Sequence, residues 1–438
     1  MNISLYQYPL TVVLAVAFLL LTWLVFRFAG NKVVHVLGGW KAGAVCMAAM
    51  IPFVMVEGTW RTALHHSIPF IVIVMAFLLC LGLSVLTKLR GGLRHNPHAR
   101  NFVITHLGVY LMIGSSFWGA PDVTEAGISV SAQKEYNIAS CDGHAMILPF
   151  SLQLDQFTID MYDDGVSPRQ YTSILTVRDT TPGTEPVKVT TSVNHPGRYK
   201  GYKMYQTSFD RAEEADSMIT IVRDPWMPLV YVGMIMLLAG ILLIFSAHWK
   251  LKVLLPSILI LTVVFTVASL ARINFSILKP TLNSIWFVPH VMIYMVAYSA
   301  MAVSVVLAIA DCLRRDKSAG TATKSGILSE SLIRVSSALL LAGMLCGCFW
   351  AERAWGRYWG WDPKECWAAV TWLLTLIYIH LAPLKNRHGK MLLTLLLIAF
   401  LAIQITWYGV YYLPSNKSSI HSYASEQPYL EAYPATNK

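Results

Sequence analysis

Ten apolar stretches divide this 438-residue chain, and each is long enough to cross a membrane core. A bilayer core of about 30 Å requires roughly 20 residues of α-helix, which satisfies its own backbone hydrogen bonds in lipid. Only 13% of the residues are charged, about half of the fraction usual in soluble domains, so a soluble fold is excluded. We therefore predict a polytopic α-helical membrane protein with about ten transmembrane helices. The stretches are 9–28, 42–57, 68–87, 102–118, 226–246, 253–271, 288–311, 330–350, 365–383 and 391–411.

The first stretch has neither a basic leader segment nor a small-residue cleavage site, so we expect it to be retained as a spanning helix.

The polar segment 119–225 interrupts the apolar stretches and carries the opposite charge to the rest of the chain. It holds 15 of the 24 acidic and 9 of the 34 basic residues, a net charge of −6, whereas the remainder carries +16. Runs rich in β-branched and aromatic residues, separated by Asp-Gly and Pro-Gly, predict antiparallel strands at 145–150, 152–162, 170–177, 187–193 and 202–209. We predict a membrane region at 1–118, an inserted antiparallel β domain at 119–225, and a second membrane region at 226–438.

The cations outside the β domain are unevenly distributed between the two sides of the predicted membrane. Alternate connections hold 17 of the 25 lysines and arginines of the membrane part, and such an excess marks the cytoplasmic side. The β domain, both termini and the connection 350–367 are therefore predicted to lie on the extracytoplasmic, periplasmic side of the cytoplasmic (inner) membrane. The net charge of +10 is thus an orientation signal, and nothing in the sequence supports nucleic-acid binding.

The connection 350–367 concentrates five of the fourteen tryptophans in eighteen residues. An interfacial aromatic belt explains a single tryptophan near a helix end. It does not explain Gly356 and Gly360 between the rings, where glycine lets the backbone approach a flat partner closely. We predict an outer shelf for a large planar anionic ligand, with guanidinium groups available to its carboxylates. The shelf residues are Trp355, Tyr358, Trp359 and Trp361, and the guanidinium groups belong to Arg353 and Arg357.

The end of this connection also matches a helix start. Asp362 is a good N-cap, Pro363 a good first helical residue, and Glu365 stands where a capping box needs a carboxylate. This capping role is predicted whatever the function, and it would hold the connection rigidly at the start of the next helix.

Four of the thirteen histidines are predicted to lie in two pairs at opposite faces of the membrane. His290 and His421 fall on the outer side with the tryptophans, and His106 and His380 fall near the inner ends of their stretches. A lone intramembrane histidine is about as often a helix–helix hydrogen bonder as a functional group, but paired imidazoles are axial ligands for haem iron. We predict two bis-histidine haem sites. The other histidines, among them His65 and His66, are predicted to be solvated or structural.

These motifs resemble the bacterial and plastid System II cytochrome c synthases in which the CcsB (ResB) and CcsA (ResC) subunits are fused. The segment Trp355-Gly-x-Tyr-Trp-x-Trp-Asp-Pro-Lys-Glu365 looks like the tryptophan-rich WWD haem-handling motif of CcsA. Segments 280–290 and 421–424 resemble those that carry its two outer histidines. Thr105-His106-Leu107-Gly108 and residues 193–201 resemble the CcsB histidine motif and β domain, so the chain is CcsB-like from about residue 40 and the first helix is additional.

The resemblance implies a holocytochrome c synthase acting in cytochrome c biogenesis. His106 and His380 would accept haem b within the membrane, and His290 and His421 would ligate its iron at the outer connection. The haem vinyl groups would then form thioether bonds with the CxxCH thiols of apocytochrome c, with a thioredoxin-like thiol-reducing system and membrane lipid as further partners. Haem would be positioned by Trp355, Tyr358, Trp359, Trp361 and Asp362. No side chain stands out in the sequence as a general acid or base.

Two other functions remain open at this point. A haem exporter without ligase activity needs the same histidines, and a b-type membrane cytochrome that transfers electrons also uses two bis-histidine haems. The seven cysteines form neither a CxxC nor a CxxCH, so the chain is not itself a c-type cytochrome.

Overall fold

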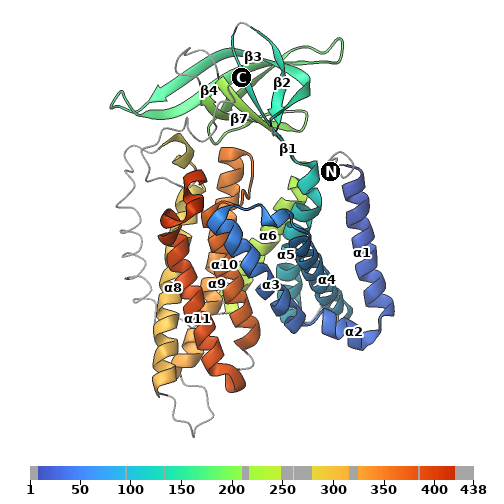
Figure 1. Cartoon of the computed structure of the whole chain (residues 1–438), viewed down its shortest axis with the longest axis vertical. Coiled ribbons are helices and arrows are strands. Elements are labelled where there is room, and N and C mark those ends of the chain that lie inside the picture. Colours follow the sequence, from blue (N-terminus) through green and yellow to red (C-terminus); the bar gives the residue numbers. More distant parts are fainter. Residues whose placement is uncertain are drawn as a thin grey trace.

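The computed structural model describes residues 8–93, 96–132, 134–141, 143–209, 217–247, 260, 279–314, 324–382 and 385–419. These residues form a bundle of helices with one eight-stranded antiparallel sheet at its end (Figure 1). Seven of the described helices are long and apolar enough to cross a membrane, and Met227–Leu243 is a shorter apolar helix. The predicted polytopic α-helical membrane fold with an inserted β domain is confirmed.

Nine of the ten predicted stretches coincide with described helices, and the tenth, 253–271, lies outside the described residues except for Ile260. A short helix, α2, was not predicted; Gly38 and Gly39 separate it from α3. The first membrane region contains α1 (Leu10–Phe28), α2 (Gly30–Leu37), α3 (Trp40–Trp60), α4 (Ile68–Arg90) and α5 (Pro97–Gly119). The second contains α6 (Met227–Ala247), α8 (Phe287–Arg314), α9 (Lys324–Trp355), α10 (Pro363–Leu381) and α11 (Lys385–Trp407).

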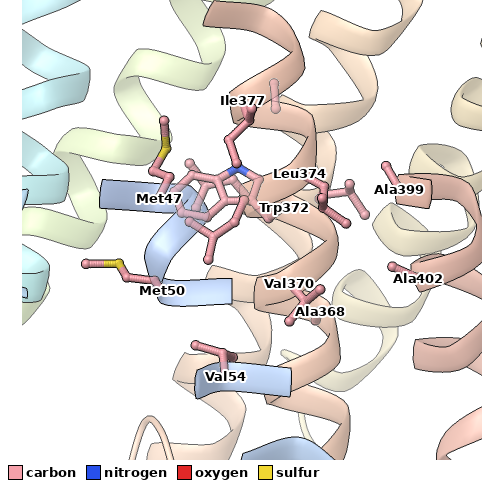
Figure 2. Close-up of a cluster of buried hydrophobic side chains, with 14 of the residues drawn as sticks. Met47, Met50, Val54, Ala368, Val370, Trp372, Leu374, Ile377, Ala399 and Ala402 are labelled. Carbon is pink, nitrogen blue, oxygen red and sulfur yellow. The ribbon is translucent and has the colours of Figure 1, made fainter. Parts of the chain in front are cut away.

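The two membrane regions share one apolar core. Helix α3 packs against α10, and α10 in turn packs against α11 (Figure 2). Met47 and Met50 of α3 lie beside Trp372 of α10 in this cluster, and all three side chains are buried. Flexible thioethers suit such a contact because they fill irregular space beside an indole ring. The first and second membrane regions therefore form a common scaffold.

The sheet stands directly on helices α5 and α6. Strand β1 follows α5, strand β8 precedes α6, and the two pair antiparallel in the middle of the strand order β5-β4-β3-β2-β1-β8-β7-β6. Gly108 and Gly233 let the backbones of α5 and α6 approach closely, as small residues do between membrane helices. The strands are β1 (Thr124–Val130), β2 (Tyr136–Cys141), β3 (His144–Met161), β4 (Pro168–Asp179), β5 (Val187–Ser192), β6 (Gly197–Tyr199), β7 (Tyr202–Phe209) and β8 (Ser217–Arg223).

The strand prediction was wrong in two respects. Predicted strands 145–150 and 152–162 are the single strand β3, because Leu148, Phe150, Leu152 and Leu154 continue one buried face without interruption. Strands β1, β2, β6 and β8 were not predicted, although β1 and β8 supply buried residues such as Ile128 and Ile219.

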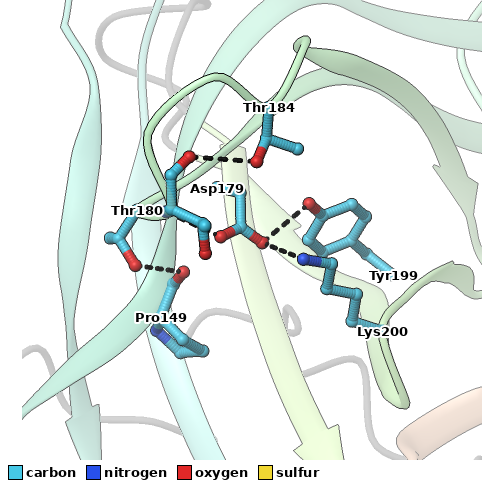
Figure 3. Close-up of polar contacts among 7 residues, drawn as sticks. Pro149, Asp179, Thr180, Thr184, Tyr199 and Lys200 are labelled. Atoms are coloured by element: carbon cyan, nitrogen blue, oxygen red, sulfur yellow. Dashed lines mark hydrogen bonds and ion pairs between the residues drawn. The ribbon is translucent and has the colours of Figure 1, made fainter.

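The ends of the sheet fold toward each other. Thr191 of β5 donates to the carbonyl oxygen of Met204 in β7 at 2.7 Å. Asp179, at the end of β4, accepts hydrogen bonds from Lys200 at 2.6 Å and from Tyr199 at 3.0 Å (Figure 3). Lys200 and Gly201 have φ of 45° and 83° and form the tight turn between β6 and β7. Asp179 thus ties this hairpin to β4.

Candidate functional site

The aromatic connection between α9 and α10 is fixed by the predicted capping box. The Asp362 carboxylate accepts from the backbone N–H of Lys364 at 3.0 Å. The Glu365 carboxylate accepts from the N–H groups of Asp362 at 3.1 Å and Gly360 at 2.8 Å. The capping prediction is confirmed, and Glu365 also holds the middle of the connection.

The aromatic side chains form two groups rather than one continuous shelf. Trp355 packs against Trp350, with ring centroids 5.1 Å apart, and Trp350 lies 6.0 Å from the ring of His290. Trp359 and Trp361 meet edge to face at 5.9 Å in the other group. Positive φ angles at Gly356 and Trp361 turn the chain between and after these rings, and residue patterns do not reveal such turns.

Gly356 brings the connection against the β domain. A Cβ atom at this glycine would lie 2.7 Å from Val222 and 3.0 Å from the ring of Tyr205. Arg357, expected to face ligand carboxylates, has its guanidinium 4.0 Å from Glu125 of β1, while Arg353 is exposed. The sheet therefore covers one side of the aromatic connection.

Tyr358 is partly buried and packs against the core of the membrane helices. Burial raises the pKa of Tyr358 to about 12, so this phenol stays protonated at neutral pH.

A buried ion pair joins the sheet to the end of α9. The Lys203 ammonium of β7 lies 2.5 Å from Glu352 Oε1, and the Tyr205 hydroxyl donates to the same oxygen at 3.0 Å. Only 5% of the Glu352 side chain is exposed. Burial, and then the adjacent Glu352 carboxylate, raise the pKa of Tyr205. Neither Lys203 nor Glu352 was singled out in the sequence, although Glu352 lies within the tryptophan-rich segment.

A second contact joins the sheet to the segment before α8. The Asn194 side chain donates to the carbonyl oxygens of Pro280 at 2.9 Å and Asn283 at 3.0 Å. This residue has a φ of 66°, which asparagine tolerates better than most residues. The sheet thus contacts the chain just before His290 and also at Glu352, near the end of α9.

His290 lies at the start of α8 and is oriented by α9. Its Nδ1 donates to the carbonyl oxygen of Gly343 at 2.7 Å, so in the neutral ring the lone pair is on Nε2. Gly347 gives the ring its space, since a Cβ atom there would lie 2.7 Å from His290 Cε1.

His106 of α5 and His380 of α10 each lie in the half of the helix that is farther from the sheet. Nδ1 of His106 donates to the Phe102 carbonyl at 2.9 Å, and Nδ1 of His380 donates to the Leu376 carbonyl at 2.7 Å. The two imidazoles belong to different helices, α5 and α10. Each neutral ring therefore has its lone pair on Nε2, the form that a metal ligand requires.

His421 lies outside the described residues. The described chain ends at Ser419, whose hydroxyl donates to Asp362 Oδ2 at 2.8 Å. The C-terminal segment therefore reaches the aromatic connection at its capping residue.

His65 is not the solvated residue that the sequence suggested. Its side chain is 18% exposed and stacks on Trp361, with centroids 4.5 Å apart and an interplanar angle of 16°. Nδ1 of His65 lies 3.5 Å from the buried carboxylate of Glu57. The sequence feature that could have indicated this role for His65 is Glu57, the only acidic residue in the apolar stretch 42–57.

Two family comparisons cover α5, the β domain and most of the second membrane region. A cytochrome c assembly protein family model matches residues 226–416, which include His290 and His380, and a ResB-like family model matches residues 101–222, which include His106.

Curated relatives that are CcsA cytochrome c biogenesis proteins match part of the chain. The CcsA cytochrome c biogenesis protein of Chlamydomonas reinhardtii is 32% identical over 153 residues, covering 33% of this chain and 42% of the relative. That of Porphyra purpurea is 30% identical over 192 residues, covering 33% and 59%. That of Cyanophora paradoxa is 43% identical over 96 residues, covering 22% and 29%. The chain thus spans less than two thirds of the length of these relatives. Because the two families meet in one polypeptide, the chain is a fused ResB-like and CcsA-like protein of the System II cytochrome c biogenesis type.

Proposed function

We propose that this protein moves haem from the end of the bundle opposite the sheet to the aromatic connection and attaches it there to apocytochrome c. One observation carries the proposal. His106 of the ResB-like region and His380 of the CcsA-like region lie in the half of their helices that is farther from the sheet, each with Nδ1 bonded to a backbone carbonyl. A haem site that takes one histidine from each region would explain why the two regions are joined in one protein, because neither region has both histidines.

The inner pair is the acceptor of haem within the membrane. His106 and His380 would ligate the iron through Nε2, and their Nδ1 bonds fix the tautomer and restrain the rings. Lys88 lies near His106, with its ammonium 5.3 Å from the centre of the Phe102 ring that stacks on this histidine. It would pair with a haem propionate. The substrate is haem b, since the later step consumes unmodified vinyl groups.

The outer site is the place of attachment. His290 and His421 would hold the iron, and haem would be oriented by Trp355, Tyr358, Trp359 and Trp361, with Asp362 fixing the connection. The protein supplies mainly position, because holding a thiol and a vinyl group in near-attack geometry replaces a bimolecular encounter. Each CxxCH thiol adds across one vinyl group, which makes the protein a holocytochrome c synthase of the lyase type.

The orientation follows the charge distribution. The sheet, the aromatic connection and both termini would lie on the extracytoplasmic side of the cytoplasmic membrane, where secreted apocytochrome c is present. A thioredoxin-like system would keep the CxxCH thiols reduced, and membrane lipid surrounds the helices.

The test is co-expression with a secreted CxxCH reporter in a host that lacks its own synthase. We expect a reporter with covalently bound haem, and none when both reporter cysteines are alanine. Haem on the outer side without a covalent product would make the protein an exporter. Two permanently bound haems with quinone-linked reduction would make it a b-type cytochrome.

A further inference from the structure

We propose that His65, oriented by Glu57, is the proton-transfer residue of the outer site: it takes the proton of the apocytochrome thiol and delivers it to the haem vinyl group. This inference deepens the proposed attachment reaction and rests on it. It assigns catalysis to the short connection between α3 and α4, which lies outside the ResB-like match.

The position of His65 is the first argument. Its ring lies nearly parallel to Trp361 at 4.5 Å, and Trp361 also contacts Trp359 and Phe70. His65 is therefore part of the aromatic group that is proposed to orient haem. It is partly exposed, so a substrate group can reach the imidazole from solvent.

The second argument is the carboxylate behind the imidazole. Glu57 is only 3% exposed, and its Oε2 accepts the backbone N–H of Leu64 at 2.9 Å. Its Oε1 lies 3.5 Å from His65 Nδ1. A buried carboxylate beside one ring nitrogen orients a histidine and stabilises the imidazolium, which leaves the other nitrogen to exchange a proton with substrate.

Backbone strain is concentrated at this contact. Five non-glycine residues among those described have a positive φ, and three of them, Arg61, Ala63 and Trp361, flank the His65–Trp361 stack. Their φ angles are 51°, 57° and 55°. Such conformations cost of order 1–3 kcal/mol each and persist where the surrounding structure enforces them, commonly at functional sites.

The connection is also held in place relative to α10. A Cβ atom at Gly58, near the end of α3, would lie 2.7 Å from Cys366 and 3.1 Å from Trp367. The Ser415 hydroxyl donates to the Gly58 carbonyl at 2.7 Å. The chain before His65 therefore cannot shift independently of the helix that follows Trp361.

The charged surroundings favour a neutral imidazole that is ready to accept a proton. Burial, and then the neighbouring His66, lower the pKa of His65, whereas Glu57 opposes the shift and Arg61 adds to it. The charged groups at the start of α10 are engaged elsewhere. Asp362 and Glu365 accept the capping bonds, and Lys364 donates to Tyr411 at 2.8 Å.

The reaction balances without an oxidant or reductant. His65 accepts the thiol proton, and the thiolate sulfur forms a bond to the vinyl carbon attached to the haem ring. The electron pair of the vinyl double bond moves to the terminal carbon, which takes the proton back from His65 and becomes a methyl group. The imidazole returns to its neutral state, so each thioether requires one cycle.

The decisive variant is His65→Phe, which keeps an aromatic ring against Trp361 but cannot transfer a proton. Full-length protein is co-expressed with the CxxCH reporter, haem content is read from the visible spectrum of the purified protein, and covalent product is measured over time. We expect normal haem content and a roughly hundredfold slower attachment, in the range typical of a lost general acid or base. The residual rate should rise with pH, because solvent then supplies the thiolate.

Two further variants complete the test. Glu57→Gln should keep haem and slow attachment by roughly tenfold, since the imidazolium loses its carboxylate. His98→Asn, at an exposed histidine at the start of α5, is the control with wild-type attachment. Attachment by His65→Phe within twofold of wild type would overturn the inference, and so would loss of its bound haem, which would make His65 a binding residue. If the wild type itself gives no covalent product, the proposed function fails instead.

Discussion

At the end of the bundle away from the sheet, His106 and His380 each donate to a carbonyl four residues earlier in their own helix. At the sheet end, the corresponding contacts join residues far apart in the sequence. His290 and Gly343 are 53 residues apart, and Lys203 and Glu352 are 149 residues apart. The proposed inner site draws on two helices, whereas the proposed outer site depends on the sheet, α3 and the C-terminal segment.

This difference predicts that substitutions at the two ends of the bundle have different effects. A change inside one helix at the inner site should affect only haem binding there, because each imidazole is oriented by its own helix. A change in the sheet or in α9 should affect the outer site from a distance and leave the inner pair as it is. Variants that separate haem content from covalent attachment test the distinction.

The largest difference between the effect on covalent attachment and the effect on haem content is expected for Lys203→Met. Removing the lysine leaves Glu352 buried beside phenols, and breaking a buried ion pair costs about 3 kcal/mol. We expect the sheet to dock poorly on the aromatic connection. Hydrogen exchange in β7 should then rise and reporter attachment should fall, while inner haem remains. Lys188→Met removes an exposed pair with Asp155 and should change stability by less than about 1 kcal/mol. Loss of inner haem in Lys203→Met would contradict the separation.

His380→Ala should produce the opposite pattern at the inner site. With one axial ligand gone, we expect at least a tenfold loss of haem from the purified protein, and His106→Ala together with His380→Ala should be little worse than either alone. Hydrogen exchange in the aromatic connection should stay at the wild-type level. His98→Ala, at an exposed histidine of α5, is the control. A wild-type spectrum in His380→Ala would refute the inner ligand pair.

Gly347→Ala tests the outer site with a single methyl group. The new Cβ would meet the His290 ring at 2.7 Å, so the imidazole must move and its 2.7 Å bond to the Gly343 carbonyl must lengthen. We expect reporter attachment to fall severalfold with inner haem unchanged. Gly114→Ala on α5 is the matched control, because its nearest neighbour would be Leu78 at 3.8 Å. Equal effects of the two variants would show that His290 is not positioned by α9.

The sequence predicted those features of the fold that depend on residues close together in the chain. Apolar length located nine described helices, and Asp362 with Glu365 revealed the start of α10. The positions of His106 and His380 along their apolar stretches also predicted a common depth, and this pairing stays a prediction. His65 and Lys203 were missed because their roles come from residues that only the folded chain brings near. An imidazole in a polar connection and a lysine in a strand carry no sequence mark of a buried carboxylate partner.

The smallest effect should come from Asp179→Asn, which changes the sheet but neither histidine site. Hydrogen bonds from Lys200 and then Thr181 lower the pKa of Asp179, so the ionised carboxylate stabilises the folded sheet. A lowered folded pKa gives stability that is present above the ordinary aspartate value, about 4, and is lost as pH falls below it. Asp179→Asn should therefore unfold at a slightly lower temperature than wild type at pH 7, and the difference should shrink below about pH 4.

Fluorescence-monitored unfolding of the purified full-length protein measures this difference in unfolding temperature, with the exposed Asp163→Asn as control. Because the contact lies between β4 and the β6–β7 turn, haem content and attachment should not change. If attachment fell in Asp179→Asn as it does in Lys203→Met, the whole sheet and not its contact with Glu352 would support the outer site.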